Sequence, residues 1–456
     1  MSSRSEIHYF GAGPAPLPTS VLERAASVLL NYDNQGIGIC EISHRSAAAT
    51  KILTDAKAAL AQLYDIPDDY EILFLQGGGS GEFSAVVYNL VARWVEKRRQ
   101  RAVAELGEGK DAEVLERLKN EVRDELKLDY LVTGSWSLKA SQEAARLVGK
   151  EHVNVAVDAR KANEGKFGKI PSEAEWSHST RPAFTYFCDN ETVDGVEFRK
   201  FPSVLEGADD DTPVVADMSS NFISRAVDVR KYGVIFGGAQ KNVGNAGITI
   251  LIVKKSLLTP MAAPTLLQQL SLPVGPIVFD WPTIAKNNSL YNTLPIFDVW
   301  VAGQVMQSLL DTFGTQKIAG QESVANQKAE LLYGVLDAHP SVYRVVPDKA
   351  ARSRMNICFR VHGGDDAREK EFLAAAEKRG LTGLKGHRSV GGMRASNCKC
   401  IAGICRDQAD PAPRQRCFPR SGSKAGSVLA GVCVLIECAS QLTHSPALQR
   451  EQYLSP

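Results

Sequence analysis

Short apolar runs rich in β-branched residues alternate with helical stretches over most of this chain, and this alternation limits the possible fold more than any other feature. It is typical of α/β proteins that are built on a mostly parallel sheet. The pattern predicts strands over residues 71–75, 130–133, 153–157, 184–188, 214–217, 234–236 and 248–253. It predicts helices over residues 20–31, 50–64, 80–97, 139–148 and 295–313. We therefore expect an α/β protein with a large domain in which helices flank a mostly parallel sheet.

A chain of 456 residues favours more than one domain. We expect the large domain over residues 1–313, including a charged helical insertion at 96–127, where interspersed acidic residues favour a surface hairpin over a basic binding arm. A smaller C-terminal α/β domain is expected over 314–397, with a helix at 327–338, a strand at 356–360 and a helix at 366–379. Residues 398–456 are rich in Cys, Arg and Pro, and we expect them to be poorly ordered.

Composition argues against several classes of partner. Lys and Arg number 53 and Asp and Glu 52, so a net charge of +1 offers no field to gather nucleic acid. The apolar stretch at 428–436 is too short to cross a membrane, and the polar start of the chain predicts no secretory signal. Cys40, Cys188 and Cys358 are expected to be small buried residues in a reducing compartment, so a cytoplasmic protein is expected. The six late cysteines contain no C-x-x-C pair, so no metal site is expected.

The most informative local feature is a lysine in a glycine-rich turn between two expected strands. The turn reads Gly237-Gly238-Ala239-Gln240-Lys241-Asn242. Lys241 is either an exposed turn residue or a partly buried amine of lowered pKa that attacks an aldehyde carbon. Asp217 ends an expected strand 24 residues earlier, and is either a cap residue or an anion that pairs with a protonated pyridine nitrogen. Together the two residues match the two ends of pyridoxal phosphate.

Three further segments follow expected strands. Gln76-Gly77-Gly78-Gly79-Ser80-Gly81-Glu82-Phe83 leads from a strand into a helix, which makes either a phosphate site or a plain tight turn. It is neither a P-loop nor a nicotinamide-binding glycine motif. Trp136 follows the strand at 130–133 and is either a ring that stacks on a cofactor or a core aromatic. Asn190-Glu191-Thr192 follows the strand at 184–188, where turn chemistry is the other reading.

These segments occur in the order in which they occur in a known family. Further matching pieces are Gly13-Pro14-Ala15, Ser43-His44-Arg45-Ser46, Gly134-Ser135-Trp136-Ser137, Asn190-Glu191-Thr192-Val193-Asp194-Gly195, Asp217-Met218-Ser219-Ser220-Asn221-Phe222-Ile223-Ser224-Arg225, Tyr291-Asn292-Thr293-Leu294-Pro295 and Leu384-Lys385-Gly386-His387-Arg388-Ser389-Val390-Gly391-Gly392-Met393-Arg394-Ala395-Ser396-Asn397. The chain resembles the phosphoserine aminotransferases, which are fold-type I pyridoxal-phosphate enzymes.

The resemblance implies a role for each matched residue around the cofactor, pyridoxal 5′-phosphate. Lys241 would carry the cofactor as a Schiff base and move a proton, and Asp217 would pair with the pyridine nitrogen. Trp136 would stack on the ring, and Thr192 would bond its phenolic oxygen. The remaining cofactor-binding residues would be Gly79, Ser80 and Gln240 at the phosphate, with Asn292 and Thr293 supplied by a neighbouring subunit. Many bacterial relatives carry arginine at position 80, so serine leaves one fewer charge in that phosphate site.

The resemblance also implies the substrates and a homodimer. Arg394 would bind the α-carboxylate, since a planar guanidinium suits a carboxylate. His44, Arg45, His387 and Arg388 would receive the phosphate or the γ-carboxylate, and His44 and Arg45 would act across the dimer interface. The implied reaction is a ping-pong exchange of an amino group between glutamate and 3-phosphohydroxypyruvate, which yields 2-oxoglutarate and phosphoserine in L-serine biosynthesis.

Two other functions stay open at this stage. One is a related transaminase of the alanine–glyoxylate or serine–glyoxylate type. The other is a chain that binds the cofactor but is catalytically impaired, because residues 398–456 depart from the family, whose members continue with a tyrosine, a short loop and a last amphipathic helix. A frame-shifted or intron-derived end is our hypothesis for this departure, and sequencing the mature transcript across codons 397–398 tests it.

Overall fold

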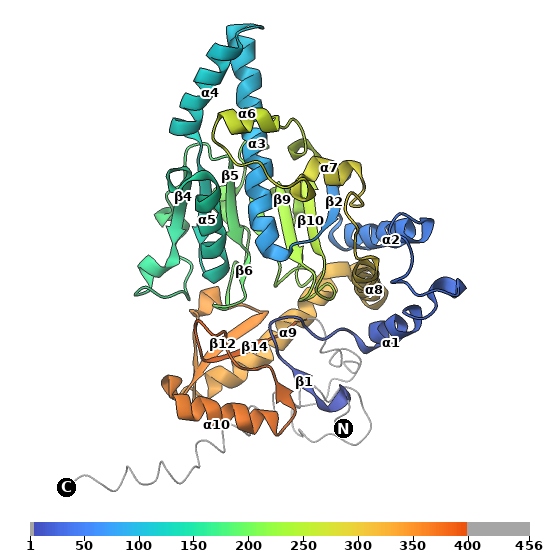
Figure 1. The fold of residues 1–456 in the computed structure, drawn as a ribbon. Coiled ribbons are helices and arrows are strands. Elements are labelled where there is room, and N and C mark those ends of the chain that lie inside the picture. Colours follow the sequence, from blue (N-terminus) through green and yellow to red (C-terminus); the bar gives the residue numbers. More distant parts are fainter. Residues whose placement is uncertain (1–3, 399–456) are drawn as a thin grey trace, which may run out of the picture.

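The computed structural model describes residues 4–398, and its main body is a seven-stranded sheet with helices on both faces (Figure 1). The strands are β2 (Tyr70–Leu75), β3 (Leu128–Val132), β4 (Val153–Asp158), β5 (Phe184–Cys188), β8 (Val214–Asp217), β9 (Val234–Gly238) and β10 (Thr249–Lys254). Their order is β2-β10-β9-β8-β5-β3-β4, in which only β10 runs antiparallel to its neighbours. The expected α/β class is confirmed, and each expected strand ends within two residues of the observed one.

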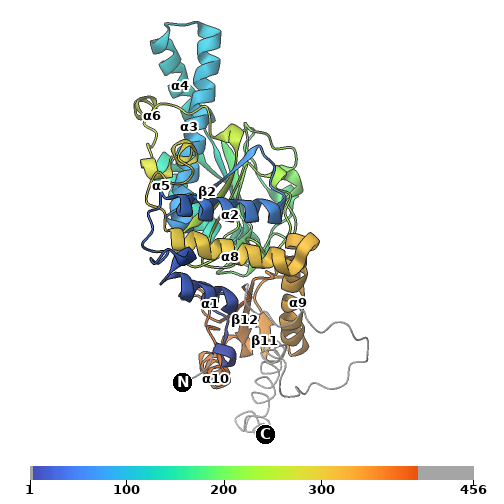
Figure 2. The same cartoon turned by 90° about the vertical axis from the view of Figure 1, so that its right-hand side faces the viewer.

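Successive side chains of each strand enter different apolar layers. In β2, Leu73 packs with the cluster under α3 (Gly78–Leu106) and α5 (Ser135–Val148), whereas Phe74 packs with the cluster under α2 (Ala47–Tyr64) and α8 (Ile296–Phe313). Figure 2 shows α2 and α8 lying side by side along one face of the sheet. Because both faces are covered, the strands read as nearly continuous apolar runs rather than as alternating ones.

Helix α3 extends nine residues beyond its expected end at residue 97 and forms a projecting hairpin with α4 (Asp111–Glu125), as Figure 1 shows. Ion pairs join the two helices, among them Arg98 with Glu125 at 2.5 Å and Arg117 with Glu105 at 2.6 Å. Leu118 is fully buried between them. The two helices carry charged residues on their outer faces and pack apolar residues against each other. This pattern explains why the segment is helical although it lies far from the sheet.

A second, smaller body contains a three-stranded antiparallel sheet in the order β11-β12-β14. Its elements are α9 (Lys317–Ala338), β11 (Tyr343–Val345), β12 (Asn356–Val361), α10 (Asp366–Glu377), β13 (Leu381–Thr382) and β14 (Met393–Ser396). The N-terminal strand β1 (His8–Tyr9) pairs with β13 in parallel, so the start of the chain lies beside this body. Short elements complete the described chain: α1 (Thr19–Val28), the β6 (Asn190–Glu191) and β7 (Val196–Glu197) hairpin, α6 (Pro264–Gln269) and α7 (Trp281–Lys286).

Three expectations about cysteines, membranes and the tail have different outcomes. Cys188 and Cys358 are buried as expected, but the expectation was wrong for Cys40, which is exposed because it lies in a loop before α2 rather than in the core. Within residues 4–398, no helix is both long and apolar enough to cross a membrane. The tail for which we expected poor order lies outside the described residues, except for the buried Cys398.

Candidate active site

Polar residues gather where neighbouring strands of the large sheet reach their carboxyl ends. Asp217 is the last residue of β8, and Lys241 lies in the loop after the adjacent strand β9. Thr192 directly follows β6, and its hydroxyl oxygen accepts a hydrogen bond from the Lys241 Nζ at 2.5 Å. Ligands of open α/β sheets bind at such strand ends. The expected lysine is therefore not an exposed turn residue, since only 8% of Lys241 is exposed.

Burial sets the charge balance of this site. It lowers the pKa of the Lys241 amine, and the negative charge of Asp217 opposes that shift. Burial also raises the pKa of the Asp217 carboxyl, although hydrogen bonds from Ser219 oppose this change. One of them runs from the Ser219 backbone N–H to Asp217 Oδ1 at 2.8 Å. A buried amine that loses its proton easily is a nucleophile and a base, and a buried carboxylate favours a cationic partner.

The glycine turn brings the start of α3 to Asp217. Gly77 and Gly78 have positive φ angles of 113° and 63°, which residues with side chains rarely adopt. At Gly79, a Cβ atom would lie 3.8 Å from Asp217 Oδ2, so the first turn of the helix lies beside the carboxylate. The first N–H groups of a helix have no partner within it and bind anions. Ser80, the next residue, is exposed.

Two acidic side chains that our sequence reasoning did not select hold the first turn of α5. The Trp136 backbone N–H donates to Glu191 Oε2 at 2.8 Å, and the Ser135 N–H donates to Asp194 Oδ2 at 2.6 Å. Burial, followed by repulsion from Asp194, raises the pKa of Glu191 to about 8. Both carboxylates belong to the segment 190–195 that we had matched by sequence, but only Thr192 received a role there. Burial distinguishes these two carboxylates from ordinary turn residues, and the sequence does not reveal that burial.

Positively charged residues from three parts of the chain act on one another near this site. Arg394, on β14, donates from Nη1 to the Thr192 carbonyl at 3.1 Å. Burial lowers the pKa of His387, and the charges of Arg394, Lys139 and then Arg388 lower it further. The Lys139 Nζ lies 4.4 Å from the centre of the Trp136 ring. Sequence reasoning missed Lys139, although its place on the turn of α5 after Trp136 was a usable signal.

Four of the expected site residues are not in contact with this cluster. His44 is partly buried, whereas Arg45 and Thr293 are exposed. Asn292 is also exposed, but its amide donates to Gln76 Oε1 at 2.6 Å, just before the glycine turn. No hydrogen bond or ion pair links any of the four to Lys241 or Asp217 within residues 4–398. Gln240, in contrast, precedes Lys241 and accepts a backbone hydrogen bond from Ala15 at 2.9 Å.

Pyridoxal phosphate, the cofactor that the sequence resemblance implies, fits these residues. Several buried donors in this part of the chain have no hydrogen-bond partner among the described residues, and they include Trp136 Nε1 and Arg394 Nε. A cationic ring nitrogen would satisfy the buried Asp217, and the Lys241 amine lies at the same sheet edge. The first turn of α3 suits the phosphate group. Among residues 4–398, no three His, Cys, Asp or Glu side chains are grouped so that they could hold a metal ion.

Comparisons with known proteins agree with this arrangement. The family model described as aminotransferase class-V matches residues 7–110 and 107–406. The phosphoserine aminotransferase of Saccharomyces cerevisiae is 44% identical over 400 residues, which cover 86% of this chain and 93% of the relative. The Drosophila melanogaster phosphoserine aminotransferase is 39% identical, covering 85% of this chain and 92% of its own length.

Solved structures give the same result. A phosphoserine aminotransferase from Bacillus circulans subsp. alkalophilus matches with a TM-score of 0.73 and 30% identity, covering 95% of this chain and 98% of its own. A pyridoxal-phosphate-bound phosphoserine aminotransferase from Trichomonas vaginalis matches with a TM-score of 0.70 and 31% identity, covering 94% and 99%. An alanine–glyoxylate aminotransferase from Nostoc sp. has 14% identity and a TM-score of 0.63, and so shares the fold alone. The chain therefore belongs to the phosphoserine aminotransferases, which are pyridoxal-phosphate-dependent transaminases of class V.

Proposed function

We propose that this chain exchanges an amino group between glutamate and 3-phosphohydroxypyruvate, which yields 2-oxoglutarate and phosphoserine, as a step of L-serine biosynthesis. The observation that carries the proposal is the buried Lys241 amine, bonded to Thr192 at the sheet edge where Asp217 ends the adjacent strand. An amino donor, glutamate, and then a keto-acid acceptor, 3-phosphohydroxypyruvate, would use this one site in turn, so the exchange is ping-pong.

Each residue of this site has its own proposed role toward the cofactor. Bound pyridoxal phosphate supplies an electron sink for the bond broken at the substrate Cα. Asp217 would hold a proton on the ring nitrogen, and the Lys241 Nζ would hold the aldehyde carbon and carry the Cα proton. Trp136 would pack against the ring, and Thr192 would bond its phenolic oxygen. The first turn of α3, at Gly79 and Ser80, would hold the phosphate together with Gln240.

Charge selects the substrates. Both amino donors carry an α-carboxylate and a second anion, and the site offers several cations. Arg394 binds the α-carboxylate, which supplies its buried Nε with a partner. His387 and Arg388 bind the phosphate or the γ-carboxylate, and this anion relieves the repulsion that lowers the pKa of His387.

A homodimer completes the site. His44, Arg45, Asn292 and Thr293 form no hydrogen bond or ion pair with Lys241 among the described residues of one chain, and we infer that they serve the site of a second copy. Large apolar side chains are exposed near two of these segments: Leu29, Leu30, Ile37, Val274, Ile277 and Tyr291. Monomeric proteins rarely expose such groups together, which supports a contact between copies.

The arrangement into domains and the cellular location are also proposals. We infer a large domain over residues 1–313 and a small one over 314–397, which packs Arg394 against the loop that bears Thr192. The pairing of β1 with β13 means that residues 8–9 join the small domain in space. We place the protein in the cytoplasm.

The test measures transfer to 2-oxoglutarate by the purified chain loaded with pyridoxal phosphate. Phosphoserine should be a better donor than alanine or serine, since neither offers a second anion to His387 and Arg388. Borohydride trapping followed by peptide mapping should locate the cofactor on Lys241. A chain that traps the cofactor but transfers nothing from phosphoserine would refute the activity and leave an impaired cofactor-binding protein.

A further inference from the structure

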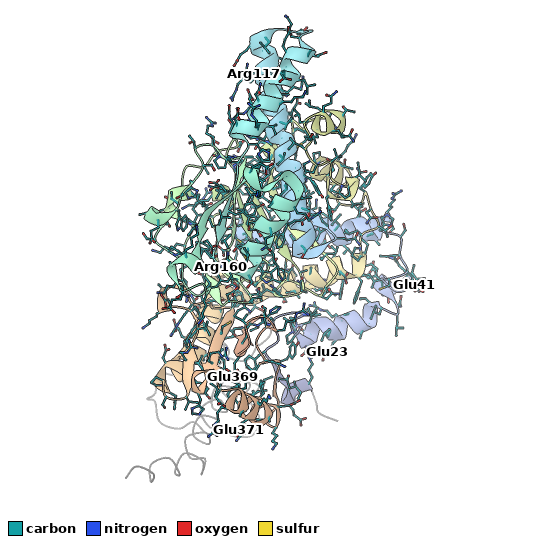
Figure 3. The ribbon with its side chains drawn as sticks, turned by 60° about the vertical axis from the view of Figure 1, so that its left-hand side comes forward. Glu23, Glu41, Arg117, Arg160, Glu369 and Glu371 are labelled. Carbon is teal, nitrogen blue, oxygen red and sulfur yellow. The ribbon has the colours of Figure 1, made fainter. Side chains whose placement is uncertain are left out.

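A second polar cavity lies at the base of the α3–α4 hairpin, away from the active site. It has a volume of about 190 Å³ and is bounded by the middle of α3, the end of α4 and the segments at residues 181–183 and 211. Figure 1 shows this hairpin rising from the sheet, and Figure 3 labels Arg117 on it, far from Glu369 in the small body. Arg93 is 14 residues along α3 from Gly79, roughly 20 Å at the rise of a helix. The cavity is therefore separate from the catalytic site.

Cations dominate the lining of this cavity. The five basic residues are Arg93, Lys97, Arg98, Arg101 and Arg181, and the two acidic residues are Glu125 and Asp211. The apolar part of the wall comes from residues such as Leu90 and Trp94. Arg98 lies 4.7 Å from the centre of the Trp94 ring, which fixes the direction of its guanidinium.

The two carboxylates are already in use. Glu125 pairs with Arg98 at 2.5 Å, and Asp211 pairs with Lys97 and, at 3.3 Å, with Arg181. In the part of the chain that the structure describes, no carboxylate forms an ion pair with Arg93 or Arg101. The site therefore holds two cations that form no ion pair of their own, although the charges of Asp210 and Asp209 act on Arg93.

Arg93 is the most informative of these cations because only 5% of it is exposed. Its Nη1 donates to the Asp210 carbonyl at 2.6 Å and its Nε to the Ser256 carbonyl at 3.3 Å, so two neutral groups hold a buried charge in place. Burial lowers the pKa of Arg93, and burial followed by the charge of Arg93 lowers that of Lys97, while the charges of Asp210 and Asp209 oppose both shifts. A bound anion would act in the same direction as these carboxylates, because a buried charge is stable only when it is paired.

We propose that this cavity is a binding site for a small phosphate-bearing anion, either inorganic phosphate or a phosphate monoester. Several guanidinium groups around one recess suit the tetrahedral oxygens of phosphate, which they bind in pairs. The recess is of small-molecule size, with a volume of about 190 Å³.

The test follows hydrogen exchange of the cofactor-loaded full chain during titration with inorganic phosphate at constant ionic strength. Saturable protection is expected in peptides that cover residues 90–101 and 121–125. Binding at the catalytic site would instead protect peptides near Gly79 and His387. A parallel titration with glycerol 3-phosphate distinguishes the two sources, because the better ligand binds at the lower concentration.

Exposed arginines provide variants that should still fold. The double variant Arg101→Gln and Arg181→Gln should weaken phosphate binding at the hairpin roughly tenfold or more, since it removes two charged donors. The control pair Arg123→Gln and Arg230→Gln removes two exposed arginines outside the cavity and should leave binding unchanged. Unaltered affinity in the first double variant, or equal protection by chloride, would overturn the proposal.

Discussion

The proposed activity depends most on one buried lysine amine. Lys241 is 8% exposed and its Nζ bonds to Thr192, and burial lowers its pKa. A group with these properties releases its proton more readily than an exposed lysine does.

Replacing this amine should stop the reaction. We expect Lys241→Ala to lower kcat for transfer from phosphoserine by roughly 10²–10⁴-fold or more, because it removes both the covalent partner and the proton carrier. The control is Lys255→Ala at an exposed lysine, which should leave kcat unchanged. Steady-state kinetics of both variants checks this, and an active Lys241→Ala enzyme would exclude the proposed role.

At the scale of single residues, the sequence predicted which polar residues lie at strand ends, but it did not predict which polar side chains are buried. Asp217 and Lys241 were predicted because a polar residue at the end of an apolar run has a defined place in an α/β sheet. Glu191 was not predicted, because a carboxylate in a turn is usually solvated, and its contact with α5 depends on two segments 55 residues apart.

At the scale of elements, Glu191 acts as an external cap for α5, whose own N-cap is Gly134 without an oxygen-bearing side chain. Both of its oxygens accept backbone N–H groups of the first turn, at Trp136 and Ser137. A cap of this kind holds the backbone of Trp136 at the start of the helix.

We expect Glu191→Gln to destabilise the chain by about 1–3 kcal/mol, because an amide N–H₂ then faces a backbone donor.

Since the pKa of Glu191 is raised to about 8, the folded chain retains a proton that the unfolded chain loses above 4.5. Folding stability from this group thus falls as pH rises between these values, and the effect of the variant should shrink toward pH 8. Chemical unfolding at several pH values, with the exposed Glu116→Gln as control, tests this; a loss that grows with pH would contradict it.

Helix boundaries show where sequence patterns lose information. The end of α3 was expected at residue 97, yet the helix continues to Leu106 because α4 covers its apolar seam. Likewise α9 begins at Lys317, ten residues before its expected start. The pairing of β1 with β13 joins residues more than 370 positions apart, which no local pattern reports.

At the scale of the whole molecule, a buried ion pair joins the two bodies. Arg354, just before β12, contacts Glu197 of β7 at 2.5 Å, and the Glu197 side chain is fully buried. Burial opposes the ionisation of Glu197, but Arg354 outweighs it and lowers the pKa of the carboxyl. The stability from this pair is therefore present at neutral pH and lost as pH falls below the ordinary value of 4.5.

Breaking this pair should lower the stability of the chain. We expect Arg354→Ala to cost about 3–5 kcal/mol of unfolding free energy, because it leaves a buried carboxylate without its partner. The matched control is Arg368→Ala, which removes a surface pair with Glu371 and should cost about 0–1 kcal/mol. Urea unfolding measures the free energy of unfolding of both variants. Equal decreases would show that the buried pair stabilises the chain no more than the surface pair does.

The proposed dimer with shared sites predicts that two inactive variants can restore activity when they are mixed. Lys241→Ala and Arg45→Ala should each be inactive alone, yet a mixed dimer contains one site with Lys241 from one chain and Arg45 from the other. Random reassembly of equal amounts should recover about a quarter of the wild-type rate, because half of the dimers are mixed and half of their sites are complete. Lys241→Ala mixed with Arg394→Ala is the control: Arg394 contacts Thr192 of its own chain, as Lys241 does, so no mixed site is complete. Recovery in the control as well, or in neither mixture, would mean that His44 and Arg45 do not serve the site of a partner.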